Sequence, residues 1–312
     1  MNSYDVAIVG GGAAGLSAAL VLSRARRTIA VIDDGTPRNA PATHMHGFLS
    51  RDGMPPSELL ATGRDEVTHY GGDLLDGAVT DVVPDGSSGF WIVLAGGRRI
   101  RTRSLLVTTG LQDELPDIPG LAKRWARDVL HCPYCHGHEV RDQQLGVIGG
   151  SPGAVRYAQI VRQWTHDLLY FTPPGLLTPA ERKGLVARAI GIIEGTIEQL
   201  IIDEDDHLRG VRMSDGSAVP REALFVPPRL VPRSQLLADL GCATNDDGWV
   251  TADNTGRTSV QGVWAAGNVV DPRAQVITAA GAGSSAAIAI NADLVDDDVR
   301  RAITSYHHGY TA

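Results

Sequence analysis

Two stretches of the chain share the same succession of an apolar strand, a glycine-rich turn and a helix. Residues 6–9 form a short apolar run that predicts a buried strand, and residues 16–23 have the spacing of a helix. Residues 28–32 predict a second strand, which completes a β-α-β unit. The same pattern returns at residues 146–148 and 155–164. The pattern therefore predicts a duplicated nucleotide-binding architecture.

The segments outside these two units predict how the domains are arranged. Residues 115–120 contain proline and glycine and indicate a domain boundary. Near the C-terminus, residues 262–267 predict another strand that runs into a glycine turn. We expect an α/β protein with two Rossmann-like, three-layer nucleotide-binding domains. The first domain is discontinuous and the second is inserted into it, so that the expected ranges are 1–115, 116–227 and 228–312.

The first glycine turn has the residues that a dinucleotide site needs. Gly10 permits the tight turn, Gly12 lets the backbone approach a pyrophosphate, and Gly15 lets the helix pack on the strand. The helix N-terminus adds unpaired N–H groups and a partial positive charge. Asp33 ends the second strand, where a carboxylate can accept a hydrogen bond from a ribose hydroxyl. The predicted site consists of Gly10, Gly12, Ala13, Ala14, Gly15 and Asp33.

A second motif, Cys132-Pro133-Tyr134-Cys135, has the spacing of a redox dithiol. His136 follows it directly and can exchange a proton with a thiol. Three other interpretations are open, one of which is an inert buried pair of cysteines, disfavoured by the charged residues around it. The motif matches the attachment signature of c-type haem, and two histidines could complete a zinc site. The nucleotide-binding turns disfavour haem, and the third cysteine, Cys242, is far away in sequence, so a redox dithiol without a metal is favoured.

The composition of the chain disfavours two classes of protein, those that bind nucleic acid and those that span a membrane. The chain has 312 residues, 43% of them hydrophobic, and a net charge of −8. Binding to nucleic acid requires clustered lysine and arginine, so an acidic chain disfavours it. No apolar stretch reaches the length of a membrane helix, and the N-terminus opens directly on a strand. We expect a cytoplasmic protein that does not bind a membrane.

Taken together, these motifs resemble the low-molecular-weight thioredoxin reductases, which are pyridine-nucleotide disulfide oxidoreductases. The resemblance rests on the first glycine turn, the Thr108-Thr109-Gly110 segment, the C-x-x-C motif and residues 262–267. It implies a homodimer with FAD in the discontinuous domain and an NADPH-type inserted domain that carries the dithiol. Cys135 would then lie against the flavin, Cys132 would exchange with substrate, and His136 would replace the usual aspartate as acid and base. Further FAD contacts implied in this way are Thr109, Gly110, Gly267, Asn268, Gln275 and Val276.

Three segments of the chain differ from the sequence pattern of the thioredoxin reductases. The second glycine turn has Ser151 and Pro152 where the family has a glycine and an acid. The strand that follows leads into a Thr-Pro-Pro segment, residues 172–174, without the arginines that hold the 2′-phosphate of NADPH. Arg182 and Lys183 are the nearest possible substitutes. At the flavin, Asn268 replaces an aspartate, and its amide can still bond a hydroxyl. FAD is therefore expected, and NADPH is doubtful.

A Cys-Pro-Tyr-Cys-His-Gly segment with a weakened NADPH site resembles the FAD-dependent dithiol oxidases of the holomycin and gliotoxin type. That resemblance implies that a small-molecule dithiol reduces the Cys132–Cys135 disulfide and that oxygen reoxidises the flavin to give hydrogen peroxide. The first alternative is a disulfide reductase supplied by NAD(P)H or ferredoxin, and the second is a non-catalytic, flavin-binding redox sensor. The family also places the loop with His44 and His46 beside the flavin, although loop histidines without a role are an equal alternative.

Overall fold

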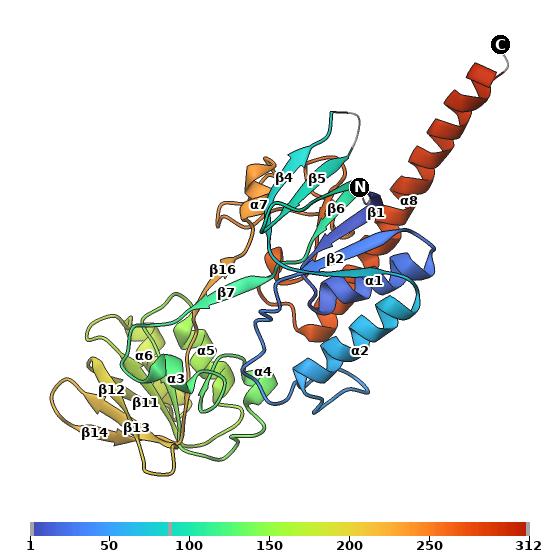
Figure 1. The fold of residues 1–312 in the computed structure, drawn as a ribbon. Helices are drawn as coiled ribbons and strands as arrows, with labels where there is room; N and C mark the ends of the chain where they lie inside the picture. The colour runs from blue at the N-terminus through green and yellow to red at the C-terminus, as the bar shows by residue number, and fades with distance from the viewer. Residues whose placement is uncertain (1–2, 87–88, 310–312) are drawn as a thin grey trace. The chain divides into compact units, whose positions relative to one another are not determined.

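The computed structural model describes residues 3–86 and 89–309 (Figure 1). The chain divides into two compact units, each built from segments that are separate in sequence. Unit 1 contains Met1–Ala40, Met54–Gln112 and Val231–Ala312, and unit 2 contains Pro41–Gly53 and Asp113–Leu230. The insertion expected from the sequence is thus present. Residues 41–53 group with unit 2, although the sequence pattern assigned them to the first domain.

Unit 1 is organised around a seven-stranded sheet in the order β3-β2-β1-β6-β5-β4, with β17 also paired to β6. Strands β1, β2, β3, β6 and β17 are parallel, and β4 and β5 are antiparallel. The carboxyl ends of parallel strands meet at one edge, which is where open α/β sheets bind ligands. The strands are β1 (Ser3–Val9), β2 (Ile29–Asp33), β3 (Asp73–Asp76), β4 (Val79–Pro84), β5 (Phe90–Leu94), β6 (Arg99–Val107) and β17 (Val263–Ala265).

The helices of unit 1 cover this sheet. Helix α1 packs along α8, the red helix in Figure 1, and small residues allow a close approach. A side-chain carbon at Gly283 would lie 2.0 Å from the carbonyl oxygen of Ala14, so this crossing requires glycine. Helix α8 itself runs over 34 residues, as far as Gly309. The helical segments are α1 (Ala13–Arg24), α2 (Pro56–His69), α7 (Gln235–Asp239), η1 (Gly267–Val269) and α8 (Val276–Gly309).

Unit 2 contains a five-stranded parallel sheet in the order β11-β10-β9-β15-β8 and a three-stranded antiparallel sheet, β12-β13-β14. A hairpin around Asp215-Gly216 joins β13 to β14. The strands are β8 (Val129–Leu130), β9 (Leu145–Ile148), β10 (Leu168–Thr172), β11 (Gly191–Glu194), β12 (Ile197–Ile202), β13 (Leu208–Met213), β14 (Ala218–Pro220) and β15 (Ala223–Phe225). The helices are α3 (Leu121–Arg124), α4 (Pro133–His136), α5 (Ala154–Val161) and α6 (Pro179–Ala187).

The chain passes between the two units four times: at either end of residues 41–53, and through β7 (Leu111–Glu114) and β16 (Arg229–Pro232), which pair as a two-stranded sheet. Proline at residues 227 and 228 immediately precedes the return strand. The fold class is the expected one, an α/β fold with two Rossmann-type domains, one inserted in the other. Within the described ranges, none of the helices combines the length and the apolar character needed to cross a membrane.

Candidate functional site

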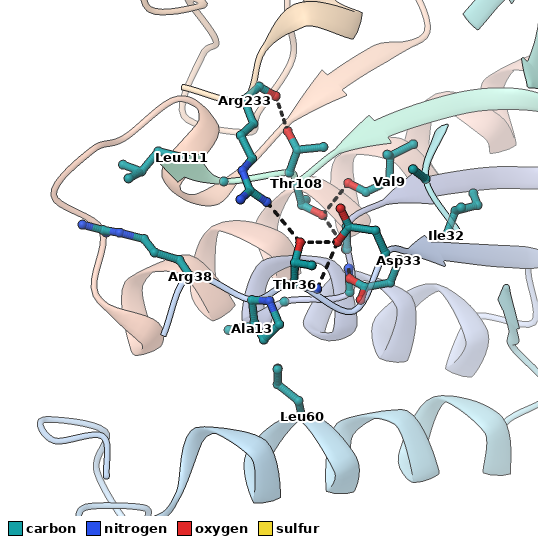
Figure 2. A pocket seen from close by; sticks show the side chains of 18 of the residues that line it. Val9, Ala13, Ile32, Asp33, Thr36, Arg38, Leu60, Thr108, Leu111 and Arg233 are labelled. Atoms are coloured by element: carbon teal, nitrogen blue, oxygen red, sulfur yellow. Dashed lines mark hydrogen bonds between the residues drawn. The ribbon is translucent and has the colours of Figure 1, made fainter. Parts of the chain in front are cut away.

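A cavity of about 470 Å³ opens in unit 1 at the carboxyl edge of its parallel strands (Figure 2). It lies over the turn between β1 and α1, so the first β-α-β unit forms one wall. The end of β6 and residues around 233–236 form other parts of the lining. Seven of the predicted cofactor residues line it: Gly10, Gly12, Ala13, Asp33, Thr109, Gly110 and Val276.

The three glycines of the turn have different surroundings. Gly10 has a φ of +107°, and a side-chain carbon there would lie 2.5 Å from the carbonyl oxygen of Thr108. A side-chain carbon at Gly15 would lie 1.9 Å from the carbonyl oxygen of Gly10. At Gly12, by contrast, no protein atom lies within 4 Å of that position. Gly10 and Gly15 are therefore required by the fold itself, whereas Gly12 leaves open the space that a bound pyrophosphate would fill.

Asp33, at the end of β2, accepts hydrogen bonds that stabilise the glycine turn between β1 and α1. One carboxylate oxygen accepts a hydrogen bond from the N–H of Gly11, and the other accepts from the N–H of Gly35 at 2.8 Å. The guanidinium of Arg64, on α2, lies 3.5 Å away. A carboxylate has about four acceptor sites, so these contacts still leave capacity for a ribose hydroxyl. The predicted contact with ribose thus fits the geometry, and Asp33 also supports the turn.

Three arginines in this cavity are absent from the predicted set. Arg38, Arg64 and Arg233 all line it. Figure 2 shows Arg233 reaching toward Thr36, whose hydroxyl is 3.4 Å from the guanidinium. Hydrogen bonding to Thr36 and the charge of Arg233 hold the pKa of Asp34 below its usual value. Guanidinium groups bind phosphate oxygens strongly, so the cavity suits an anionic dinucleotide.

The remaining predicted cofactor residues lie beneath or beside the cavity. Gly267 faces Ala14: a side-chain carbon at Gly267 would lie 3.0 Å from the Ala14 methyl group. The side-chain nitrogen of Asn268 donates to the carbonyl oxygens of Asp271 and Ala274, both at 2.9 Å. This amide nitrogen therefore shapes the turn that precedes α8. Contact of Asn268 or Gln275 with a cofactor stays a prediction.

Cys132 and Cys135 form a disulfide at the start of α4 in unit 2. Pro133 occupies the first helical position, where the missing N–H costs no hydrogen bond. The N–H of Cys135 points to the sulfur of Cys132 at 3.1 Å. This N–H stabilises a thiolate on Cys132 whenever the disulfide opens. Within the described residues, no three His, Cys, Asp or Glu side chains gather as metal ligands.

Aromatic side chains pack against the dithiol turn. A side-chain carbon at Gly137 would lie 2.5 Å from the carbonyl oxygen of Pro133 and 2.7 Å from the indole of Trp164. Glycine at this position therefore allows Trp164 to pack directly behind the turn. The ring of Tyr134 meets that indole edge to face at 5.7 Å and is 64% exposed. Trp164 carried no signal in the sequence that linked it to the cysteines.

His136 follows the dithiol and is half-buried. Burial lowers the pKa of its imidazole, and the carboxylate of Glu139 opposes that shift. Glu139 also lies 3.5 Å from the ring of His46, which belongs to the same unit. His136 is therefore mainly neutral at pH 7, and a neutral imidazole can accept the proton of a thiol.

The second glycine turn lies between β9 and α5. A side-chain carbon at Gly149 would lie 2.4 Å from the hydroxyl of Tyr170, just as one at Gly10 would overlap backbone in the first turn, so packing requires glycine at both positions. At the position equivalent to Gly12, the second turn has the exposed Ser151. Arg182, a possible substitute for the missing phosphate clamp, pairs with Glu194. The second turn therefore lacks the glycine that lets a backbone approach a pyrophosphate.

Comparison with known proteins gives a consistent set of similarities. The sequence model of the family described as pyridine nucleotide-disulphide oxidoreductase matches residues 4–284. Thioredoxin reductase sirT of Leptosphaeria maculans is 30% identical, with 95% of this chain and 96% of that protein covered. Thioredoxin reductase tcpT of Claviceps purpurea is 31% identical, with coverages of 86% and 87%. The crystal structure of HlmI is similar with a TM-score of 0.95 and 54% identity, over 97% of this chain and 96% of that one.

Proposed function

The chain belongs to the pyridine nucleotide-disulphide oxidoreductase family and is an oxidoreductase, and we propose that it is an FAD-dependent dithiol oxidase. In this proposal it closes an intramolecular disulfide in a small-molecule dithiol, with oxygen as the final acceptor. The observation that carries the proposal is the contrast between the two glycine turns. The first leaves space for a dinucleotide at Gly12, whereas the second has Ser151 at the equivalent position and no arginine in the Thr-Pro-Pro segment, residues 172–174, at the end of β10. The Cys132–Cys135 disulfide lies in the same unit as this second turn.

The residues of unit 1 fit FAD. The open space at Gly12, the N-terminus of α1 and the three arginines of the cavity suit a pyrophosphate, and Asp33 suits a ribose. Thr109 and Gly110 line the same cavity after β6. When bound, FAD would supply a two-electron acceptor that oxygen can reoxidise, with hydrogen peroxide as the product.

The dithiol exchanges with the substrate in two steps. A substrate thiolate attacks the sulfur of Cys132, the Cys132–Cys135 bond breaks, and Cys135 becomes a thiolate. The second substrate thiolate then attacks the substrate sulfur of this mixed disulfide, which releases Cys132 as a thiolate and closes the substrate disulfide. The N–H of Cys135 faces the sulfur of Cys132, so it stabilises the leaving thiolate of the second step.

His136 is the proposed base for these steps. The substrate loses two protons and two electrons, and the electrons pass to the Cys132–Cys135 pair. Because burial lowers the pKa of His136, its neutral ring is available at pH 7 to take a thiol proton. Below that pKa the imidazolium cannot accept a proton, so the rate of exchange falls as the pH falls.

A disulfide reductase is the second candidate, because sirT and tcpT both carry the name thioredoxin reductase. This function requires a reductant for the flavin. Ser151 replaces the second glycine of the turn where NADPH would bind, and Arg182 is paired with Glu194, so ferredoxin is the more compatible donor. The two candidates differ in the direction of electron flow through Cys135.

We also propose that the protein is a homodimer. Helix α8 also exposes a row of apolar side chains, which begins within the part that packs on α1 and continues past it. The exposed residues recur at intervals of three, four and seven along the helix, so they share one face. They are Ile288, Val295, Val299, Ile303 and Tyr306.

The products of turnover in air distinguish these functions. With a small aromatic or aliphatic dithiol, we expect one oxygen molecule to be consumed and one hydrogen peroxide to form for each substrate disulfide. With NADPH and oxidised thioredoxin, we expect no NADPH oxidation above background. An oxygen electrode with a peroxide assay measures the first, and NADPH absorbance measures the second. Reduction of thioredoxin at the expense of NADPH, without oxygen uptake, would contradict the proposal.

A further inference from the structure

The carbonyl groups that lead into the dithiol turn are all hydrogen-bonded. Strand β8 ends at Leu130, whose carbonyl oxygen accepts from the N–H of Val226 at 2.8 Å. The carbonyl oxygen of Cys132 accepts from two N–H groups of α4, both at 3.1 Å. Between them, the carbonyl oxygen of His131 accepts from the hydroxyl of Tyr157 on α5. A side chain from another helix of unit 2 therefore holds the residue before Cys132.

Tyr157 is itself held by packing within unit 2. Its ring meets that of Phe225, on β15, edge to face with the ring centroids 6.4 Å apart. It also packs against the buried apolar cluster that contains Leu145 and Ala158. Burial raises the pKa of the Tyr157 hydroxyl, so the hydroxyl stays protonated at neutral and moderately alkaline pH. The carbonyl oxygen of His131 thus has a permanent donor in a fixed place.

This hydrogen bond restricts the peptide that joins His131 to Cys132. A peptide unit is planar, so a bond that holds its oxygen also restricts its N–H and the Cα atom of the next residue. The next residue is Cys132, whose sulfur is bonded to that of Cys135. The ring of His131 stacks on that of Trp125, with the centroids 6.4 Å apart, so side chain and carbonyl are both held.

We infer that Tyr157 is a positioning residue that keeps Cys132 where its sulfur meets that of Cys135, and that it thereby favours the disulfide over the dithiol. When the disulfide is reduced, the bond between the sulfurs is absent and the peptide before Cys132 is freer to turn. Its oxygen then meets the Tyr157 hydroxyl less often, so the hydrogen bond stabilises the oxidised form more than the reduced form. This effect goes beyond the proposed function, because it holds in whichever direction electrons pass.

Tyr157→Phe keeps the ring and its packing but removes the donor. Glutathione reduces the disulfide by two exchanges, in which two glutathione thiols become one glutathione disulfide and the protein gains two cysteine thiols. We expect the equilibrium constant of this reduction to rise about threefold to tenfold in Tyr157→Phe, the range that one hydrogen bond contributes. Replacing Tyr157 by 4-aminophenylalanine, which keeps a donor on the same ring, should restore the wild-type constant.

Tyr170→Phe is the matched control. It removes the hydroxyl of another tyrosine of unit 2, which is 2% exposed and lies on β10. That hydroxyl lies beside Gly149 at the second glycine turn, and not at the dithiol turn, so the equilibrium constant should stay unchanged. If Tyr157 had only a structural role, its loss would lower the unfolding temperature of the oxidised and reduced proteins alike and would also leave the constant unchanged.

The measurement is anaerobic equilibration of the FAD-loaded proteins with glutathione buffers of stepped ratio, followed by acid quench, alkylation in denaturant and mass spectrometry. One label per chain marks the disulfide and three mark the dithiol, because Cys242 is free in both forms. A rise in Tyr157→Phe alone supports the inference. An unchanged or lower constant in Tyr157→Phe, or an equal rise in Tyr170→Phe, would overturn it. The assay uses neither a substrate dithiol nor oxygen, so its result is independent of the proposed function.

Discussion

Replacing Cys135 by serine is expected to abolish oxidation of dithiols, with a loss of at least about a thousandfold in kcat/KM. Without the second sulfur there is no disulfide for a substrate thiolate to attack. Cys132 is then left as a free thiol, and electrons cannot leave the substrate. The measurement is oxygen uptake with a small dithiol, together with flavin absorbance after anaerobic mixing, which should stay that of the oxidised cofactor.

The third cysteine provides a matched control. Cys242 is 6% exposed and lies 3.5 Å from the hydroxyl of Thr258. Burial raises the pKa of its thiol, so it is a poor nucleophile. Cys242→Ser keeps a hydrogen-bonding group at this position and should retain activity. If the Cys135→Ser protein still turns over and the Cys242→Ser protein does not, the dithiol has been assigned to the wrong cysteines.

Replacing Gly12 by valine should give a folded protein that lacks flavin. The backbone at Gly12 is extended, with φ of −81°, and the first side-chain carbon would have no neighbour within 4 Å apart from the adjacent residues of the chain. Valine would instead occupy the space of the pyrophosphate. Forcing a side chain into occupied space costs about 1–3 kcal/mol of binding free energy. The hydrogen bonds lost between the backbone N–H groups of the turn and the pyrophosphate add to this cost, so FAD affinity should fall by about a hundredfold or more. Flavin absorbance per mole of purified protein measures the loss.

Gly15 gives the contrasting variant within the same turn. Gly15→Ala would place a carbon 1.9 Å from the carbonyl oxygen of Gly10 and 2.8 Å from the hydroxyl of Thr108. Because the backbone must move to relieve this overlap, the midpoint temperature of thermal unfolding should fall even for the protein without bound cofactor. A Gly12→Val protein that purifies yellow, with flavin bound one to one, would show that the dinucleotide lies elsewhere.

Local sequence patterns were sufficient to predict the elements of both β-α-β units. The conformation of a glycine turn between an apolar strand and a helix depends on about ten neighbouring residues, so a local pattern identifies it. In the same way, the C-x-x-C spacing alone brings the two thiols close enough to form a disulfide. The end of α8 was not predicted, because charged residues beyond position 294 continue the helix without a core to pack on. The grouping of residues 41–53 with unit 2 was also missed, since it depends on contacts with distant residues.

Long-range packing explains the side chains that the sequence could not assign. Arg38, Arg64 and Arg233 meet in one cavity although they are separated by up to 195 positions, so no spacing rule connects them. Ser151 and Pro152 suggested a weakened second nucleotide site, and the pairing of Arg182, a possible substitute for the missing arginines, with Glu194 could not be read from the sequence. For His46, a place beside the flavin and a loop position without a role were equal expectations, and its ring lies within 3.5 Å of Glu139 and Asp52.

Electron entry through the dithiol, and not through a bound nicotinamide, is the central claim of this account. Anaerobic titration of the purified FAD-loaded protein tests it most directly, first with NADPH and then with a small dithiol, with flavin absorbance as the readout. We predict that NADPH at micromolar concentration leaves the flavin oxidised, that the dithiol bleaches it, and that peroxide appears when air is readmitted. Bleaching by stoichiometric NADPH before any dithiol is added would contradict the account.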